Sequence, residues 1–421
     1  MSEPLEVVFV GLGYIGLPTA VVMANHGVRV HGVDVNASAV ERIQRGEVTI
    51  VEPGLEEQLK KAIDSGQLTA TTEMQHGDAF VIAVPTPFKK NYEGDLSYIL
   101  SAAESIAPQL RGDETVILES TSPPRTTQTL ARKIMELRPD LSLDGEDGKP
   151  VVYFAYCPER ILPGKALEEL ISNDRIIGGS TPEAARRAKE VYASFCQGEL
   201  LATDDVTAEL SKLTENSFRD VNIAFANELS LIADKLGIDV WELIELANHH
   251  PRVNILQPGP GVGGHCIAVD PWFIVDAAPQ TARLIRSARE INDAKPQWVI
   301  DQAKAAAFDV QQATGRTPVV AALGLAFKPN IDDLRESPAL NIAVELADQF
   351  SASAVLVAEP HVEALPAKLQ GKANVELVSA ADAIARADVI LLLVDHDAFA
   401  DLAPSAAGKR VIDTRGQWRR G

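Results

Sequence analysis

The chain has 421 residues, a formal net charge of −20 and only three cysteines. That length exceeds what one hydrophobic core usually organises, so two or three domains are expected. The acidic excess disfavours nucleic acids and anionic membranes as partners, and an anionic ligand would need local cations. Cys157, Cys196 and Cys266 are too scattered for a disulfide framework, and no apolar run approaches a membrane span. These features predict a soluble cytoplasmic protein.

Residues 1–200 alternate short β-branched runs with helical patterns, which predicts a parallel α/β domain. The expected strands are Val7–Val10, Val28–Val33, Phe80–Val84, Thr115–Leu118 and Val151–Ala155.

Residues 201–310 are predicted to form a central helical domain. Val206 to Leu236 contains neither glycine nor proline, and its apolar residues recur at helical spacing, which predicts one long helix. The apolar residues expected on one face are Leu210, Leu213, Val221, Ala224 and Ile232. Helical patterns continue over Trp241–Asn248 and Arg283–Phe308. Such a segment can serve as a dimer interface, although periodicity does not distinguish a dimer face from an internal one.

Residues 311–421 return to alternating strands and helices, without a glycine fingerprint. The expected strands are Val319–Leu323, Ala354–Val357, Val389–Val394 and Arg410–Ile412, and a helix is expected over Ala339–Phe350. The predicted fold class is therefore α/β, with two Rossmann-like, doubly wound parallel-sheet domains joined by a helical domain.

A dinucleotide-binding fingerprint follows the first predicted strand. Gly11, Gly13 and Gly16, with Tyr14 and Ile15 between them, lie between an apolar run and a helical pattern, which is the context that this motif requires. The pyrophosphate would bind at the helix N-terminus, where N–H groups favour negative charge. Asp34 ends the second predicted strand and is placed to accept hydrogen bonds from the adenosine ribose. Because Asp34 would repel a 2′-phosphate, NAD is favoured over NADP.

Three threonines are further candidates for cofactor contacts. Thr86, Thr121 and Thr127 lie at the ends of later strands or at the following helix start. Ligands bind at this edge of such sheets, although a threonine here can also simply cap a helix.

The glycine-dense stretch Gly259–Asp270 contains Cys266, with a carboxylate four residues later. Glycines let backbone N–H groups approach a ligand closely, so the stretch predicts a nucleophile presented to a bulky ligand. A glycine loop of this kind can also be purely structural. His249, His250 and His265 lack metal-ligand spacing to other donors, so no metal is predicted.

The long helix carries a polar stripe. Lys212 and Asn216 are four residues apart and therefore share a face, and Arg219 lies on the same side. A helical lysine is usually solvated, but this stripe interrupts an apolar segment and indicates a face that lines a cleft. Glu159 adds a carboxylate after a predicted strand, and Lys328 follows the first strand of the last domain.

Together these motifs resemble the UDP-glucose/UDP-N-acetylmannosamine dehydrogenase family over nearly the whole chain. The matching segments are Gly11–Gly16, Val84–Pro87, Glu119–Pro123, Cys157–Arg160, Lys212–Arg219, His250–Asn254, Gly259–Asp270 and Phe327–Pro338. The run from His250 to Phe273 is similar to the N-acetylated branch. The UDP-glucose branch typically has lysine where this chain has Ala268. The resemblance therefore implies UDP-N-acetyl-D-mannosamine as the substrate and NAD as the cofactor.

The resemblance also implies a mechanism. The family oxidises a sugar C6 alcohol to a carboxylate in two hydride transfers, with no release of the aldehyde. Cys266 would form a thiohemiacetal and then a thioester, which water hydrolyses. Lys212 and Asn216 would donate to the oxyanion, and Asp270 or Glu159 would activate the water.

The resemblance further assigns the binding residues. Those implied to line the UDP-sugar site are Arg160, Ile161, Lys212, Asn216, Arg219, His250, Gly263, Phe327 and Lys328. Arg335 would reach the NAD pyrophosphate. Arg252 would enter from the neighbouring subunit of a homodimer.

Four alternatives stay open at this point. The chain could be a UDP-N-acetylglucosamine 6-dehydrogenase or a UDP-glucose 6-dehydrogenase. It could be a two-electron hydroxyacid dehydrogenase, which would have no use for Cys266, or a non-catalytic NAD-binding sensor. Tyrosine-dependent epimerases and reductases are disfavoured because the chain lacks their Tyr-x-x-x-Lys pair.

Overall fold

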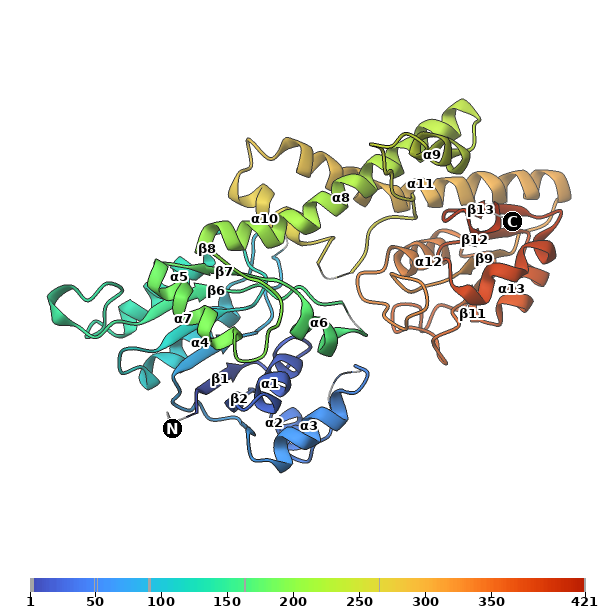
Figure 1. Ribbon diagram of the computed structural model, residues 1–421. Helices are drawn as coiled ribbons and strands as arrows, with labels where there is room; N and C mark the ends of the chain where they lie inside the picture. Colours follow the sequence, from blue (N-terminus) through green and yellow to red (C-terminus); the bar gives the residue numbers. More distant parts are fainter. Residues whose placement is uncertain are drawn as a thin grey trace. The chain divides into compact units, whose positions relative to one another are not determined.

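The computed structural model describes residues 4–48, 50, 52–89, 92–162, 164–264 and 266–419 (Figure 1). The chain divides into two compact parts, Met1–Glu215 and Asn216–Gly421. The three-domain division at residues 200 and 310 stays a prediction. Within the described ranges, every helix is too short or too polar to span a membrane. His265 lies outside the described residues.

The first part is built on an eight-stranded sheet with the order β3-β2-β1-β4-β5-β6-β7-β8. Its strands are β1 (Glu6–Val10), β2 (Arg29–Val33), β3 (Leu68–Thr71), β4 (Ala79–Ile82), β5 (Thr115–Leu118), β6 (Tyr153–Tyr156), β7 (Arg175–Gly179) and β8 (Leu200–Asp204). Strands β1 to β6 are parallel, as predicted. Strand β7 is antiparallel to β6, and β8 is parallel to β7. The prediction of an all-parallel sheet is therefore wrong at this edge.

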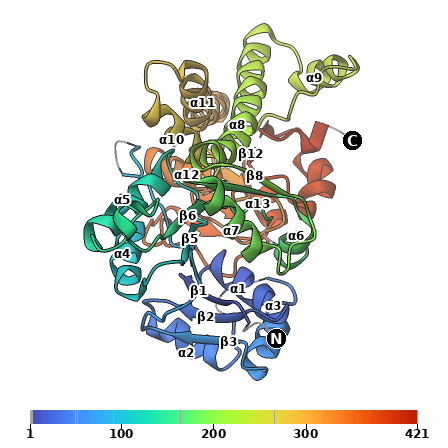
Figure 2. The same cartoon turned by 60° about the vertical axis from the view of Figure 1, so that its left-hand side comes forward.

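Helices cover both faces of this sheet (Figure 2). They are α1 (Gly16–Asn25), α2 (Ala37–Gln44), α3 (Leu55–Asp64), α4 (Ser97–Ile106), α5 (Thr126–Leu137), α6 (Ala166–Ser172) and α7 (Pro182–Tyr192). Successive side chains of a strand alternate between faces, so Val7 and Phe9 pack with α1, α3 and α7, whereas Val8 and Val10 pack with α4 and α5. Burial on both faces explains why β1 reads as a continuous apolar run.

The second part contains a five-stranded parallel sheet with the order β11-β10-β9-β12-β13. Its strands are β9 (Val320–Leu323), β10 (Val355–Ala358), β11 (Val375–Leu377), β12 (Val389–Leu392) and β13 (Arg410–Asp413). Its helices are α9 (Val240–Asn248), α10 (Asp270–Ala277), α11 (Arg283–Thr314), α12 (Pro338–Gln349) and α13 (Ala380–Arg386). Helices α11 and α12 pack on one face and α13 on the other. The predicted fold class, with two doubly wound sheets, is confirmed.

The two sheets share one local design at their central strands. In the first, the N–H of Gly11 after β1 donates to the carbonyl of Val33 at 2.8 Å. In the second, the N–H of Gly324 after β9 donates to the carbonyl of Ala358 at 2.8 Å. Both glycines have positive φ, +98° and +89°, which favours glycine. The chain therefore leaves each central strand through the same kind of turn.

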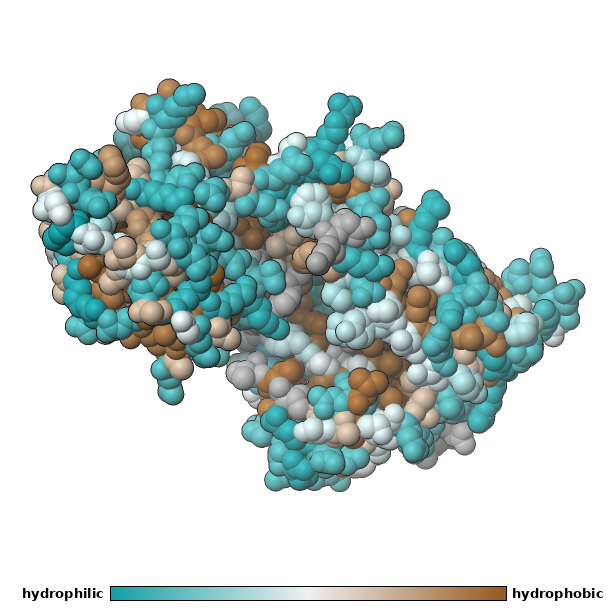
Figure 3. Space-filling model, turned by 180° about the vertical axis from the view of Figure 1, so that it is seen from behind, coloured by the Kyte–Doolittle hydropathy of each residue, from teal (hydrophilic) through white to brown (hydrophobic). Residues whose placement is uncertain are grey.

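The predicted long helix is α8 (Asp205–Leu236). Leu213 and Ala224 are buried, but Leu210 and Ile232 are 40% and 47% exposed, so the predicted single apolar face is wrong. The helix has a buried stripe and a separate exposed apolar one, which the spacing of apolar residues alone does not separate. The face drawn in Figure 3 is mainly hydrophilic with scattered hydrophobic residues, in keeping with the net charge of −20.

Candidate active site

Two glycines of the fingerprint lack a side chain for different structural reasons. A Cβ on Gly16 would lie 2.0 Å from the carbonyl oxygen of Gly11, so only glycine lets α1 start this close to the turn. Gly13, in contrast, has no heavy atom within 4 Å of where its Cβ would lie. That open space over the N-terminus of α1 is where a pyrophosphate would bind. The residues present therefore fit NAD.

Asp34 and Tyr14 are held in place beside this turn. The carboxylate of half-buried Asp34 accepts hydrogen bonds from the N–H groups of Leu12 at 2.8 Å and Asn36 at 2.9 Å. The hydroxyl of Tyr14 donates to buried Glu52 at 3.4 Å. Glu52 also accepts from the N–H of Ala166 at 2.7 Å, so it links the turn to the start of α6. The sequence analysis missed Glu52, which has no motif around it.

The three candidate threonines differ in what they can offer a cofactor. The hydroxyl of Thr86 donates to the carbonyl of Thr121, and both residues are half-buried. Thr127 is fully buried, and its hydroxyl donates to Glu209 at 2.7 Å. Burial raises the pKa of Glu209 to about 7, although the N–H and hydroxyl of Thr127 oppose that rise. In this conformation the Thr127 hydroxyl is held by Glu209, and its predicted cofactor contact stays a prediction.

Glu159 belongs to a buried charge cluster that the sequence did not reveal. One guanidinium, that of Arg175 on β7, lies 3.2 Å from Glu159 and 3.7 Å from Glu119. Burial, and then the charge of Glu159, raise the pKa of Glu119 to about 8. This raised pKa favours the protonated form of Glu119, and Arg175 balances the charge of Glu159. Burial also raises the pKa of Cys157 to about 12, so its thiol stays protonated at neutral pH and is a poor nucleophile.

Cys266, Asn216 and Asp270 lie in the second part. Cys266 is exposed, and its carbonyl accepts the N–H of Asp270, the first residue of α10, at 2.8 Å. Asp270 is buried, and its Oδ2 accepts from the side-chain amide of Asn216 on α8 at 2.5 Å. The structure thus joins two predicted catalytic residues and places the cysteine before a helix N-terminus, which favours negative charge. Lys212 is half-buried one turn before Asn216, within the first part.

A cavity of about 460 Å³ lies next to the glycine loop in the second part. It is lined by four predicted ligand residues, Arg219, Gly263, Phe327 and Lys328. A Cβ on Gly263 would lie 2.5 Å from the carbonyl oxygen of Glu336, so the loop packs too closely for any other residue. This size suits a small ligand.

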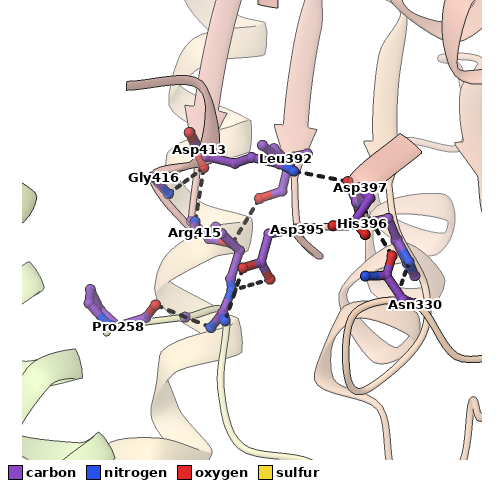
Figure 4. A network of polar contacts seen from close by, with 12 residues as sticks. Pro258, Asn330, Leu392, Asp395, His396, Asp397, Asp413, Arg415 and Gly416 are labelled. Carbon is purple, nitrogen blue, oxygen red and sulfur yellow. Dashed lines mark hydrogen bonds and ion pairs between the residues drawn. The ribbon is translucent and has the colours of Figure 1, made fainter. Parts of the chain in front are cut away.

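Arg415 is a cationic residue of this cavity that the sequence analysis missed. It follows β13, pairs with Asp395 at 2.8 Å and donates to the carbonyl of Pro258 at 3.3 Å (Figure 4). The N–H of Gly259, next in the chain, donates to buried Asn227 on α8 at 2.9 Å. The base of the glycine loop is therefore held from two sides. An arginine two residues after a short strand gives no motif from which to predict this.

Other predicted ligand residues have protein partners in this conformation. Arg160 pairs with Glu215 at 2.6 Å, and Arg335 pairs with Asp333 at 2.6 Å. His250 and Arg252 are exposed after α9, where the N–H of Arg252 donates to the His250 ring at 3.3 Å. Ile161 is half-buried. Their binding roles stay predictions.

Three family models match consecutive stretches of the chain. They describe the NAD binding domain, the central domain and the UDP binding domain of the UDP-glucose/GDP-mannose dehydrogenase family, at residues 5–196, 206–294 and 321–420. The chain belongs to this family. The resemblance inferred from the motifs is thus confirmed, and the chain is an NAD-dependent oxidoreductase that acts on a UDP-sugar.

Several similar proteins have names. The chain is 56% identical to an NDP-N-acetyl-D-galactosaminuronic acid dehydrogenase of Ralstonia nicotianae, covering 97% of this chain and 95% of that protein. It is also 56% identical to the UDP-N-acetyl-D-mannosamine dehydrogenase of Escherichia coli K12, covering 97% and 98%.

Solved structures are similar over nearly the whole chain. A UDP-N-acetyl-mannosamine dehydrogenase from Staphylococcus aureus is 44% identical with a TM-score of 0.82, covering 97% of this chain and 94% of that one. A UDP-D-ManNAc dehydrogenase from Pyrococcus horikoshii is 36% identical with a TM-score of 0.83, covering 98% and 96%.

The different surroundings of two fingerprint glycines give a paired prediction. Gly13→Ala should weaken NAD binding about tenfold or more, because its methyl group enters the space left for the pyrophosphate. It should leave the melting temperature nearly unchanged. Gly16→Ala should lower the melting temperature by several degrees, because its methyl group meets the Gly11 carbonyl. Calorimetric titration with NAD and thermal unfolding measure both effects. Unchanged NAD affinity in Gly13→Ala would contradict this site.

Proposed function

We propose that this chain oxidises C6 of UDP-N-acetyl-D-mannosamine to give UDP-N-acetyl-D-mannosaminuronate, consuming two NAD per sugar. The observation that carries the proposal is the placement of Cys266. It is exposed, precedes α10, and lies in sequence between Gly263 and Ile267, which both line the cavity. A dehydrogenase that removes only two electrons has no use for a nucleophile there.

The chemistry balances as two oxidations and one hydrolysis. NAD supplies the hydride acceptor for each oxidation. The first converts the C6 alcohol to an aldehyde, and the Cys266 thiolate adds to its carbonyl carbon to form a thiohemiacetal. The second oxidation gives a thioester, and water then displaces Cys266 and leaves the carboxylate. The covalent bond to Cys266 explains why no aldehyde need escape.

Specific side chains support these steps. Lys212 and the amide of Asn216 are suited to donate to the oxygen that becomes negative during addition and hydrolysis. Asp270 is favoured as the group that positions and deprotonates water, because Asn216 holds its carboxylate and its backbone N–H donates to the carbonyl of Cys266. Glu159 is less suited, because Arg175 balances its charge within a buried cluster.

Cations in the cavity support a nucleotide-sugar ligand. Arg219, Lys328 and Arg415 line it together with Asp395, which pairs with Arg415, and the remaining positive charge suits a diphosphate despite the net charge of −20. We extend the binding roles to Arg160, Ile161, His250 and Gly263 by the family resemblance, and assign Arg335 to the NAD pyrophosphate.

The identity of the sugar rests on the relatives and on one residue. Ala268 stands where the UDP-glucose branch typically has lysine, which favours an N-acetylated sugar. The named relatives at 55–56% identity act on mannosamine or galactosamine derivatives by their names. An N-acetylgalactosamine-type substrate is therefore the second candidate.

A panel of three sugars tests the substrate. With purified protein and saturating NAD, kcat/KM for UDP-N-acetylmannosamine should exceed that for UDP-N-acetylgalactosamine and UDP-N-acetylglucosamine by about tenfold or more. Spectrophotometric release of NADH gives all three values. A preference for the galactosamine sugar would select the second candidate. Turnover of UDP-N-acetylglucosamine alone would contradict both.

We also propose a cytoplasmic, homodimeric enzyme that supplies a uronic acid for polysaccharide synthesis. A thiolate nucleophile needs a reducing compartment, which supports the cytoplasmic location. Phe218, Phe225 and Ile232 are exposed at seven-residue spacing on α8, an apolar stripe suited to pack against a second copy. Arg252, exposed after α9, would then reach the neighbouring active site.

The stripe predicts how the dimer can be broken. Phe225, 51% exposed, lies in its middle, so Phe225→Asp should convert the protein to monomers by burying a charge in the interface. Leu137→Asp on α5, also at an exposed position, is the matched control and should stay dimeric. Sedimentation velocity distinguishes these states. A Phe225→Asp protein that stays dimeric would contradict this interface.

A further inference from the structure

A buried carboxylate follows β10 at the position that Asp34 has after β2. This residue, Glu359, accepts three hydrogen bonds at Oε2, from the N–H groups of Leu325 at 2.7 Å and Ala326 at 3.0 Å and from the His396 ring at 3.1 Å. Burial alone would raise the pKa of Glu359, but these hydrogen bonds, that of His396 first, lower it below its ordinary value. Asp34 is half-buried beside the NAD turn, whereas His396 covers Glu359.

His396 connects Glu359 to the other end of the same loop. Its ring is fully buried, and its Nδ1 accepts the N–H of Asn330 at 3.0 Å (Figure 4). Nδ1 therefore carries no proton, and Nε2 donates to Glu359, which makes His396 neutral in this tautomer. The side chain of Asn330 in turn accepts the N–H of Asp397 at 3.0 Å. Loop 325–330 is thus pinned at its start by Glu359 and at its end by His396.

The same residues invite a different interpretation as a metal site. Glu359, His361 and His396 have ligand atoms within 4.8 Å of one another. A metal on Nε2 of His396 would displace its proton while Nδ1 still accepts from Asn330, so the ring would have to become an imidazolate. The Oε2 of Glu359 already accepts three donors. The hydrogen bonds therefore favour a structural role over a metal site. We call Glu359 and His396, which hold the two ends of loop 325–330, the latch.

The latched loop forms part of the ligand cavity. Ala326, Phe327, Lys328 and Pro329 all line it, whereas Glu359 and His396 lie beneath and are not among the lining residues. We propose that Glu359 and His396 are positioning residues, which hold loop 325–330 in the shape that presents Phe327 and Lys328 to the UDP-sugar. The inference rests on the UDP-sugar substrate argued above, and it concerns how the loop is held.

Two substitutions of one histidine separate its hydrogen bonds from its bulk. His396→Leu removes both bonds, whereas His396→Gln keeps an amide N–H for Glu359 and a carbonyl for the Asn330 N–H. Calorimetric titration with UDP should show affinity weakened about tenfold or more in His396→Leu, and within about threefold of the original in His396→Gln. In turnover, His396→Leu should raise KM for the UDP-sugar with kcat and the KM for NAD nearly unchanged.

Two further variants complete the test, one as a control for general damage to the core and one as a second change to the latch. Ile384→Val on α13 trims the buried core of the same sheet away from the loop, and it should bind UDP like the unaltered protein. Glu359→Gln keeps the size of the latch but removes its charge, and it should also weaken UDP binding.

The outcomes distinguish this inference from the proposed function. Unaltered UDP affinity in folded His396→Leu or Glu359→Gln would overturn the latch alone. Equal losses in His396→Leu and His396→Gln would also overturn it, because the ring and not its hydrogen bonds would then matter. If the unaltered protein did not bind UDP, the UDP-sugar substrate would fail, and the latch with it.

Discussion

Both nucleotide-binding sheets depend on one kind of hydrogen bond, from a backbone N–H after the central strand to a carboxylate after its neighbour. In the first sheet the pair is Leu12 and Asp34, and in the second it is Leu325 and Glu359. Each bond fixes the turn at the carboxyl end of the sheet, which is where such folds bind ligands. The two sheets then diverge in chemistry. Asp34 is half-buried and suited to a ribose, whereas His396 covers Glu359 and converts it into a support for the UDP-sugar loop.

The charged side chains fall into two groups, cations that line the ligand cavity and buried carboxylates that have partners within the protein. A chain with a net charge of −20 must bind a diphosphate through locally placed cations, and Arg219, Lys328 and Arg415 provide them along one cavity. Elsewhere the fold keeps buried charges balanced, since Arg175 lies between Glu119 and Glu159 while the pKa of Glu119 is raised to about 8. Asp270 is likewise held by Asn216. Buried carboxylates here are hydrogen-bonded or neutral, as burial demands.

The sequence predicted what local patterns encode. Continuous apolar runs predicted the central strands, and the absence of glycine and proline predicted α8. The fingerprint from Gly11 to Gly16 predicted the NAD site. Residues whose roles depend on distant partners were not predictable, since Arg415, Glu359 and His396 stand alone after short strands. The reversed direction of β7 depends on pairing across the sheet, which apolar spacing does not encode. For the same reason, burial of Thr127 against Glu209 was not foreseen.

The central claim is that Cys266 makes one active site carry out two oxidations, and counting NADH per sugar tests it most directly. UDP-N-acetylmannosamine in limiting amount should yield two NADH per sugar and a uronate product. The account also predicts that Cys266→Ser, still folded and still binding UDP, no longer reaches two. One NADH per sugar in the unaltered protein, with free aldehyde as the product, would contradict the covalent role of Cys266. Two NADH per sugar at an unchanged rate in Cys266→Ser would contradict it equally.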